Sequence, residues 1–213
     1  MQSSASVVAE PANPELDAVR LEALDCQRCD LWQGRTQVVM GEGNPHAGIL
    51  LMGEAPGANE DATGRPFVGR AGQLLDSALE EAGIGRNDVY ITNVVRCRPT
   101  AVKGGSVTNR APRAGEIAAC EPWRWLEISL VNPQVVVCVG GPAAKSLIDK
   151  KLKITEQRGR FFDKEDGRAY IATLHPAYVL RLYSADRDAY RTARANLVSD
   201  FRQAQERAAT KPR

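Results

Sequence analysis

Four short apolar runs recur along the chain, and each predicts a buried strand. They cover residues 49–53 (ILLMG), 89–94 (VYITNV), 135–139 (VVVCV) and 169–173 (AYIAT). The runs are apolar almost throughout instead of alternating with polar residues. That pattern is typical of strands in a parallel sheet with helices on both of its faces.

The segments between these runs have the spacing of helices. Leu74, Leu75 and Leu79 predict a helix over 70–82 that stops at Gly83. Asn13 and Pro14 have the composition of a helix start. Further helices are predicted from that start to the first cysteines, at 114–130, at 142–149 and around 190–201. Strands that alternate with helices predict the α/β class.

The same pattern predicts the domain organisation. Residues 1–12 are small and polar and predict a disordered lead, 13–203 form a single domain, and 204–213 form a loose tail. The N-terminus lacks the features of a secretory signal, and no apolar run approaches the roughly 20 residues that span a bilayer. We therefore expect a cytoplasmic, nucleoid-associated monomer without a membrane segment.

The overall composition is that of a globular protein, and the net charge of only +2 does not point to any class of partner. The local distribution of charge is more informative, since the segment 96–113 contains no acid and five basic residues, Arg96, Arg98, Lys103, Arg110 and Arg113. Such a run is either a solvated loop or a surface that binds nucleic acid.

Cysteines supply the next candidate site. Cys26 and Cys29 form a CxxC, and Cys97 and Cys120 follow far along the chain. Without a secretory signal, a metal site is favoured over disulfides, and thiolates suit zinc or an iron–sulfur cluster. Only one close pair is present, which weakens the zinc interpretation, and Cys97 and Cys120 could instead be buried packing residues. Cys138 lies inside an apolar strand and is predicted to be core.

Polar and glycine-rich segments follow the strands, where ligands bind in parallel sheets. The first is 53–61 (GEAPGANED), whose glycines allow close approach of a flat ligand and whose acids, Glu54, Glu60 and Asp61, offer acceptors. The alternative is a tight strand–helix turn with solvated acids.

Three single residues also have two possible roles. Phe67 is either core or a surface on which a flipped base stacks. Asn93 is either a turn residue or a group that reads a base edge. A lone histidine is more often structural, but the position of His175 at a strand end favours a functional role.

Taken together, GEAPGANEDATGRPFVGRAGQLL, VYITNVVRCRP, the cysteine pattern and LHPAYVLR resemble the family-4 uracil-DNA glycosylases over roughly residues 20–203. The resemblance implies a three-layer α/β/α sandwich around a central parallel four-stranded sheet. It implies a structural [4Fe-4S] cluster on Cys26, Cys29, Cys97 and Cys120. It also implies a DNA-repair enzyme that flips uracil out of double- or single-stranded DNA and hydrolyses the N-glycosidic bond, leaving an abasic site.

The resemblance also implies roles for individual residues. Phe67 stacks on uracil, Asn93 bonds its O4 and N3–H, and His175 donates to its O2. The uracil-binding set it implies is Gly53, Glu54, Ala55, Gly57, Asp61, Phe67, Asn93 and His175. Related families place an aspartate where this chain has Ala55, so we expect the main chain to position the water, with Glu54 as the nearest acid. The alternatives are Glu60, Asp61 or a dissociative path that needs little help. DNA contacts are expected at Arg96, Arg98, Lys103, Arg110, Arg113, Tyr178 and Arg181.

The chain departs from the family pattern in two further places. Ala177 replaces a common serine, so a backbone N–H is expected to replace that phosphate contact. The loop between Cys97 and Cys120 is long, but 101–113 contains no histidine that could attack the sugar. We therefore expect turnover without covalent capture. One alternative is a module that binds uracil-containing or single-stranded DNA with little or no catalysis. Another is a zinc-bearing nucleic-acid-binding domain or a fragment of a polymerase-associated protein.

Overall fold

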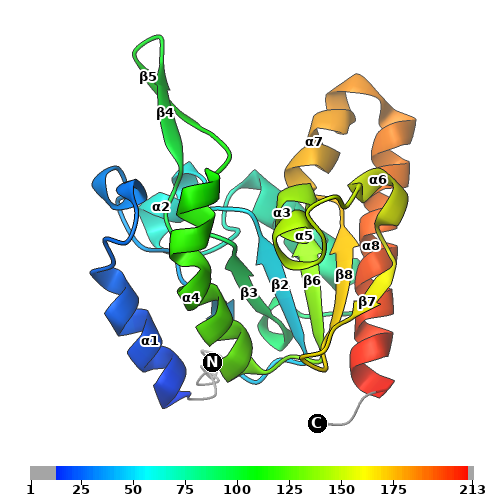
Figure 1. Ribbon diagram of the computed structural model, residues 1–213. Helices are drawn as coiled ribbons and strands as arrows, with labels where there is room; N and C mark the ends of the chain where they lie inside the picture. Colours follow the sequence, from blue (N-terminus) through cyan, green and yellow to red (C-terminus); the bar gives the residue numbers. More distant parts are fainter. Residues whose placement is uncertain (1–12, 211–213) are drawn as a thin grey trace, which may run out of the picture.

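The computed structural model describes residues 13–210, which form a six-stranded sheet between two layers of helices (Figure 1). The strand order is β1-β3-β2-β6-β8-β7. The bounds of these strands are β1 Glu42–Gly43, β2 Ile49–Gly53, β3 Tyr90–Asn93, β6 Val135–Val139, β7 Phe161–Asp163 and β8 Ala169–Thr173.

The four central strands β3, β2, β6 and β8 are parallel and match the four apolar runs, which confirms the α/β fold. Four strands are too few, however, because β1 and β7 add antiparallel edges. These edge strands are only two and three residues long and are partly exposed, so they lack the apolar signal of the central ones.

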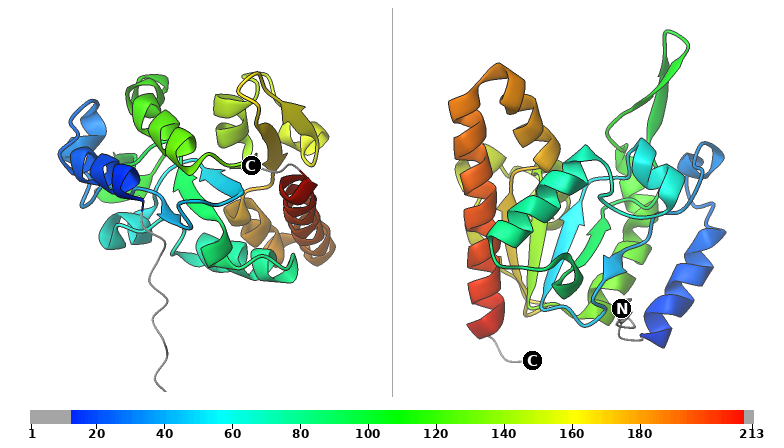
Figure 2. Two further views of the ribbon diagram at one scale, coloured as in Figure 1. Left: turned by 90° about the horizontal axis from the view of Figure 1, so that it is seen from below. Right: turned by 180° about the vertical axis from the view of Figure 1, so that it is seen from behind.

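Helices cover both faces of the sheet, as the apolar runs require. Leu50 and Met52 of β2 face a layer that contains α1, α4 and α5, whereas Ile49 and Leu51 face α3 and α8 (Figure 2). Full burial of such a side chain contributes about 1.5–3 kcal/mol. The helices are α1 Pro14–Leu24, α2 Ala58–Thr63, α3 Arg70–Glu81, α4 Ala114–Val131, α5 Gly141–Leu147, α6 Ile154–Gln157, α7 Pro176–Ala185 and α8 Arg187–Thr210, with 3-10 turns at Asp30–Gln33 and Arg86–Asp88.

Three segments differ from the sequence-based expectations. The tail does not loosen at 204, because α8 continues to Thr210 with Ala204 fully buried against the sheet. Helix α7 was missed, although its proline at the first helical position is a helix-start signal. The basic loop contains a hairpin, β4 Thr100–Lys103 and β5 Ser106–Asn109.

The predicted disordered lead 1–12 and the last residues 211–213 lie outside the described residues. Within 13–210, no helix is both long and apolar enough to cross a membrane.

Candidate active site

A cavity of about 630 Å³ lies where the carboxyl ends of β2, β3 and β8 meet. Six of the eight residues predicted to bind uracil line it: Glu54, Ala55, Gly57, Phe67, Asn93 and His175. Sequence reasoning missed several polar lining residues, among them Asn59, Arg70 and Asn109. Asn109 carries no local signal in the sequence, because only the β4–β5 hairpin brings it back to the cavity.

Asn93 ends β3 beside Gly53, its parallel partner on β2. A Cβ on Gly53 would lie 2.3 Å from Asn93 Oδ1 and 2.5 Å from Phe67 Cζ. Gly53 does not line the cavity, but its lack of a side chain leaves room for these two residues that do. Asn93 is 2% exposed, and its carboxamide has no hydrogen-bond partner among residues 13–210. Its acceptor and donors are therefore available to a ligand in the cavity.

Phe67 is held against the cavity by an unusual backbone. Its φ of 52° lies in the left-handed region that aromatic residues rarely adopt. Arg86 donates to Phe67 O at 3.3 Å, and a Cβ on Gly72 would lie 1.7 Å from that oxygen. The Phe67 ring is 6.0 Å from the His175 ring, so these two side chains form adjoining parts of one wall.

His175 is the N-cap of α7, and this fixes its tautomer. Its Nδ1 accepts the N–H of Ala177 at 3.1 Å, which places the proton of the neutral ring on Nε2. Burial, reinforced by the positive charge of Arg181 and opposed by Glu60, lowers the pKa of His175 to about 4. The ring is therefore a neutral Nε2–H donor at neutral pH. The Ala177 N–H is used in this bond, so the backbone N–H expected to replace the serine contact to phosphate would have to come from another residue.

The nearby acids have different environments. Glu54 follows β2 directly, burial raises its pKa, and its carboxylate has no hydrogen-bond partner in the described part of the chain. Glu60 instead accepts the backbone N–H groups of Gly57, Val68 and Gly69 at 2.9–3.0 Å. Glu60 therefore ties two loops of the cavity together, whereas the Glu54 carboxylate is not engaged by the described residues.

Asp61 does not belong to the cavity, which corrects its prediction as a uracil-binding residue. It is 3% exposed, and its Oδ1 accepts the N–H of Thr36 at 2.9 Å. On α2 its side chain faces the 34–38 segment, where it anchors a loop.

Arg96 does not belong to a DNA-binding surface, which corrects a second prediction. It is 1% exposed, and its guanidinium donates to the carbonyl of Asn93 and the carboxylate of Glu127. Glu127 is fully buried in α4 and also accepts from Tyr90 and Thr92 at 3.0 and 2.8 Å. This network fixes the end of β3, so a phosphate cannot reach Arg96.

Other predicted DNA contacts lie at the surface. Lys103, Arg113 and Arg181 are exposed and form no salt bridge among residues 13–210, although the hydrogen bond from Arg110 and the charge of Arg113 lower the pKa of Glu116. Tyr178 is 40% exposed, and the Arg181 guanidinium lies 5.8 Å from its ring. Arg98 donates to Asn109 at 2.7 Å.

Arg110 lines the cavity but is paired with Glu116 at 2.5 Å. Its charge is therefore largely balanced within the protein.

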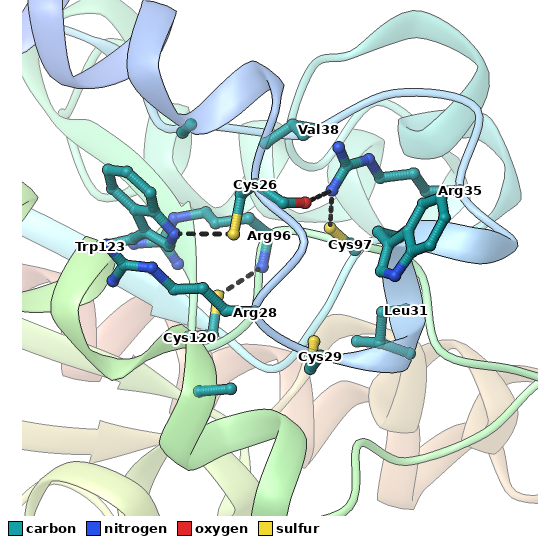
Figure 3. A pocket seen from close by; sticks show the side chains of 13 residues that line it. Cys26, Arg28, Cys29, Leu31, Arg35, Val38, Arg96, Cys97, Cys120 and Trp123 are labelled. Atoms are coloured by element: carbon teal, nitrogen blue, oxygen red, sulfur yellow. Dashed lines mark hydrogen bonds between the residues drawn. The ribbon is translucent and has the colours of Figure 1, made fainter.

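The four predicted cysteines line a second pocket, beside the end of β3 (Figure 3). Three N–H groups point at their sulfur atoms: Trp123 Nε1 at 3.2 Å from Cys26, Arg35 Nη1 at 3.5 Å from Cys97, and the Arg96 backbone at 3.3 Å from Cys120. Arg28, Arg35 and Arg96 also line this pocket and bring positive charge to it. N–H donors and cations suit thiolate ligands that carry net negative charge. Cys138 lies fully buried in β6, as predicted.

Four thiols can hold either a single zinc ion or an iron–sulfur cluster. A zinc ion holds sulfurs at about 2.3 Å from one point. Among residues 13–210, no three His, Cys, Asp or Glu side chains are placed to hold a single metal ion. The described thiols are therefore not arranged around a single point in this structure.

The fold and cavity define an α/β protein whose ligand site lies at the carboxyl ends of parallel strands. The chain belongs to the uracil-DNA glycosylase superfamily, whose family model matches residues 40–198. It is 48% identical over 157 residues to a type-4 uracil-DNA glycosylase of Thermotoga maritima, covering 73% of this chain and 78% of that protein.

Further relatives extend this likeness. A type-4 uracil-DNA glycosylase of Saccharolobus solfataricus is 38% identical over 205 residues, covering 92% of this chain and 88% of that protein. A DNA polymerase of Bacillus phage SP01 is 33% identical over 142 residues, which are 66% of this chain and 14% of the polymerase.

Proposed function

We propose that this protein is a monofunctional uracil-DNA glycosylase that excises uracil in DNA repair and leaves an abasic site. Family membership and the names of its type-4 relatives support this function. The observation that carries it in this chain is the convergence of Phe67, Asn93 and His175 on one cavity at the strand ends. A base inside a duplex must leave the stack to reach such a site, at a cost of a few kcal/mol.

Recognition of the base falls to Asn93 and Phe67. The Asn93 carboxamide can donate to uracil O4 and accept from N3–H, whereas cytosine presents the opposite pattern at these positions. The rigid Phe67 loop supplies a flat surface for stacking. Because the Asn93 carboxamide is buried, a base with the wrong pattern would leave it unpaired, which costs about 1–3 kcal/mol.

Bond cleavage leaves an oxocarbenium-like sugar and a uracil anion. The neutral His175 donates its Nε2–H to the charge that develops on uracil O2. Loss of one such preorganised donor typically lowers the rate by about 10²–10³. Glu54, with its raised pKa and unpaired carboxylate, positions the water that attacks the sugar.

The DNA backbone is held by cationic residues of the 98–113 segment and of α7, namely Arg98, Lys103, Arg113 and Arg181, with Tyr178 close to the vacated base position. Arg110 contributes less because Glu116 pairs with it. Each lost phosphate contact should reduce the slope of log affinity against log salt by about 1. The absence of histidine from residues 101–113 favours turnover over covalent capture.

Cys26, Cys29, Cys97 and Cys120 hold one [4Fe-4S] cluster in this proposal. The cluster supplies a covalent cross-link between segments that lie far apart in the chain, and it takes no part in the cleavage. The N–H groups on three of the sulfurs and the cationic side chains around them support this assignment. Broad visible absorbance of the purified protein, together with its iron and sulfide content, would test it.

A strand-cleavage assay tests the function. The protein is incubated with a labelled oligonucleotide that contains one uracil, and alkali then cuts at abasic sites. The wild type should cut U·G, U·A and single-stranded substrates, and Asn93→Ala and His175→Ala should lower the rate at least about 10²-fold. His46→Ala, at the other and exposed histidine, is the matched control and should retain full activity.

Two results would contradict the proposal. Tight binding of uracil DNA by the wild type without cleavage would indicate a binding module instead. A protein–DNA band that survives boiling in detergent would indicate covalent capture.

A further inference from the structure

The β4–β5 hairpin projects from the body of the protein at the same end as the cavity (Figures 1 and 2). Its strands join through Gly104 and Gly105, with φ of 58° and 78°. Positive φ at both positions is the signature of the two-residue type I′ turn, which keeps paired strands closely aligned. The hairpin is therefore a defined arm and not an irregular loop.

One face of this arm is apolar and faces solvent. Val102 pairs with Val107, and they are 76% and 59% exposed. Residues directly opposite each other in a hairpin point to the same face, and successive residues along one strand point to opposite faces. Val102 and Val107 therefore share a face with the next alternate pair, Thr100 and Asn109, and Asn109 lines the cavity. The face that carries the two valines thus continues outward from the cavity wall, through the polar pair Thr100 and Asn109.

The charge of the segment indicates what covers this face. Residues 98–113 contain four cationic side chains and no acid. The hairpin carries Lys103, and Arg98, Arg110 and Arg113 flank its base, where Glu116 pairs with Arg110. Two exposed valines beside cationic side chains suit the sugar edges of a nucleic acid strand with phosphates next to them. A second copy of the same hairpin would bring like charges together, which disfavours self-association.

The length of the arm sets its reach. Four residues per strand at about 3.4 Å each extend roughly 14 Å from the cavity, and successive nucleotides of one strand rise about 3.4 Å along the helix axis. The arm therefore spans about four nucleotides.

We propose that the β4–β5 hairpin follows the uracil-containing strand on one side of the flipped nucleotide and packs Val102 and Val107 against its sugars. This inference rests on the proposed glycosylase function and adds a footprint to it. The arm runs in one direction from the cavity, so it contacts the strand either 5′ or 3′ of uracil and not on both sides.

Single-stranded substrates with a central or off-centre uracil test the arm, since strand pairing then stays constant. One substrate has two nucleotides on each side of uracil, and two others carry ten extra nucleotides on either the 5′ or the 3′ side. The ratio of kcat/KM between a long and the short substrate is measured for wild type and for Val102→Ser/Val107→Ser. A matched control, Ala101→Ser/Thr108→Ser, changes the opposite, also exposed face of the hairpin.

For the wild type, one of the two long substrates should exceed the short one. In Val102→Ser/Val107→Ser that advantage should fall by about tenfold, as expected for two valines that each lose part of their burial. The control should keep the wild-type ratio. A variant with Ala101–Thr108 replaced by two glycines should lose the advantage entirely, and the point variants decide the question if this shortened chain does not fold.

An equal ratio of kcat/KM between long and short substrates in wild type and the valine variant would refute the proposed role of the hairpin. It would not contradict the proposed glycosylase function. An equal advantage for both long substrates would also refute the proposed contact on one side of uracil. A wild-type dimer that dissociates in the valine variant would show instead that the valines bind a second copy of the chain. A wild type that releases no uracil from any substrate would instead overturn the proposed function, and the arm with it.

Discussion

The protonation state of His175 is the most direct test of the proposed chemistry. With a pKa of about 4, only roughly one molecule in a thousand carries the imidazolium at pH 7. At the ordinary pKa of about 6.5 the fraction would be about a quarter. If the neutral ring is the donor, the single-turnover rate should not fall as the pH rises from 6 to 8. A cationic donor would lose rate over that range as it loses its proton.

The chain has only two histidines, which makes the group directly observable. In a His46→Gln variant, the remaining imidazole Cε1–H resonance belongs to His175, and its chemical shift can be followed by NMR between pH 4 and 8. We expect little change above pH 5.5. A titration with a midpoint near 6.5, together with a rate that falls above it, would refute the assignment of a neutral donor.

The same shift predicts how stability depends on pH. The unfolded chain takes up the His175 proton near pH 6.5, whereas the folded chain resists it until about pH 4. The unfolded state then binds more protons within this window, so stability should fall as the pH drops from 6.5 to 4. The shift of about 2.5 pKa units sets an upper bound of about 3 kcal/mol, reduced by the partial exposure of His175. His175→Gln should remove this part of the slope in thermal melts at several pH values.

Three substitutions test the surroundings of the site. Glu127→Gln leaves the buried Arg96 without its counter-charge and should cost about 3–5 kcal/mol in unfolding free energy; a cost below 1 kcal/mol would contradict the buried pair. Asp61→Ala should cost about 1–3 kcal/mol but change kcat by less than about twofold, and a large loss of kcat would restore its predicted role at uracil. Gly53→Ala places a Cβ 2.3 Å from Asn93 Oδ1 and should lower kcat/KM for uracil by at least about tenfold; wild-type activity would show that the cavity wall can move.

The central strands could be predicted because burial on both faces leaves a continuous apolar run. The residues Val135–Val139 show this most clearly, since every one of them is buried. The β4–β5 hairpin left no such trace, because its strands are exposed apart from the partly buried Thr100 and their alternating residues meet no core. Its Gly104-Gly105 turn was the available signal.

Charge was the least reliable guide to the site. Arg96 stands in a basic run that otherwise faces solvent, and nothing local marks it as buried. Its partner Glu127 lies 31 residues away on α4, so the pair exists only through the packing of that helix on the sheet. The same holds for Asp61, whose role depends on a contact with the 34–38 segment. A buried ionic contact depends on tertiary structure, which local composition does not reveal.

Arg96 also joins the two pockets. Its backbone N–H donates to Cys120 Sγ, its side chain donates to the carbonyl of Asn93, and Cys97 follows it directly in the chain. Four residues span at most about 14 Å, so a displacement of the cysteine set can be transmitted to the end of β3. A structural cluster on these thiols would fix the segment 93–97 at both ends, through covalent bonds at Cys97 and hydrogen bonds at Asn93. In the proposed function, this geometry is how a cluster that takes no part in cleavage sets the position of the Asn93 amide.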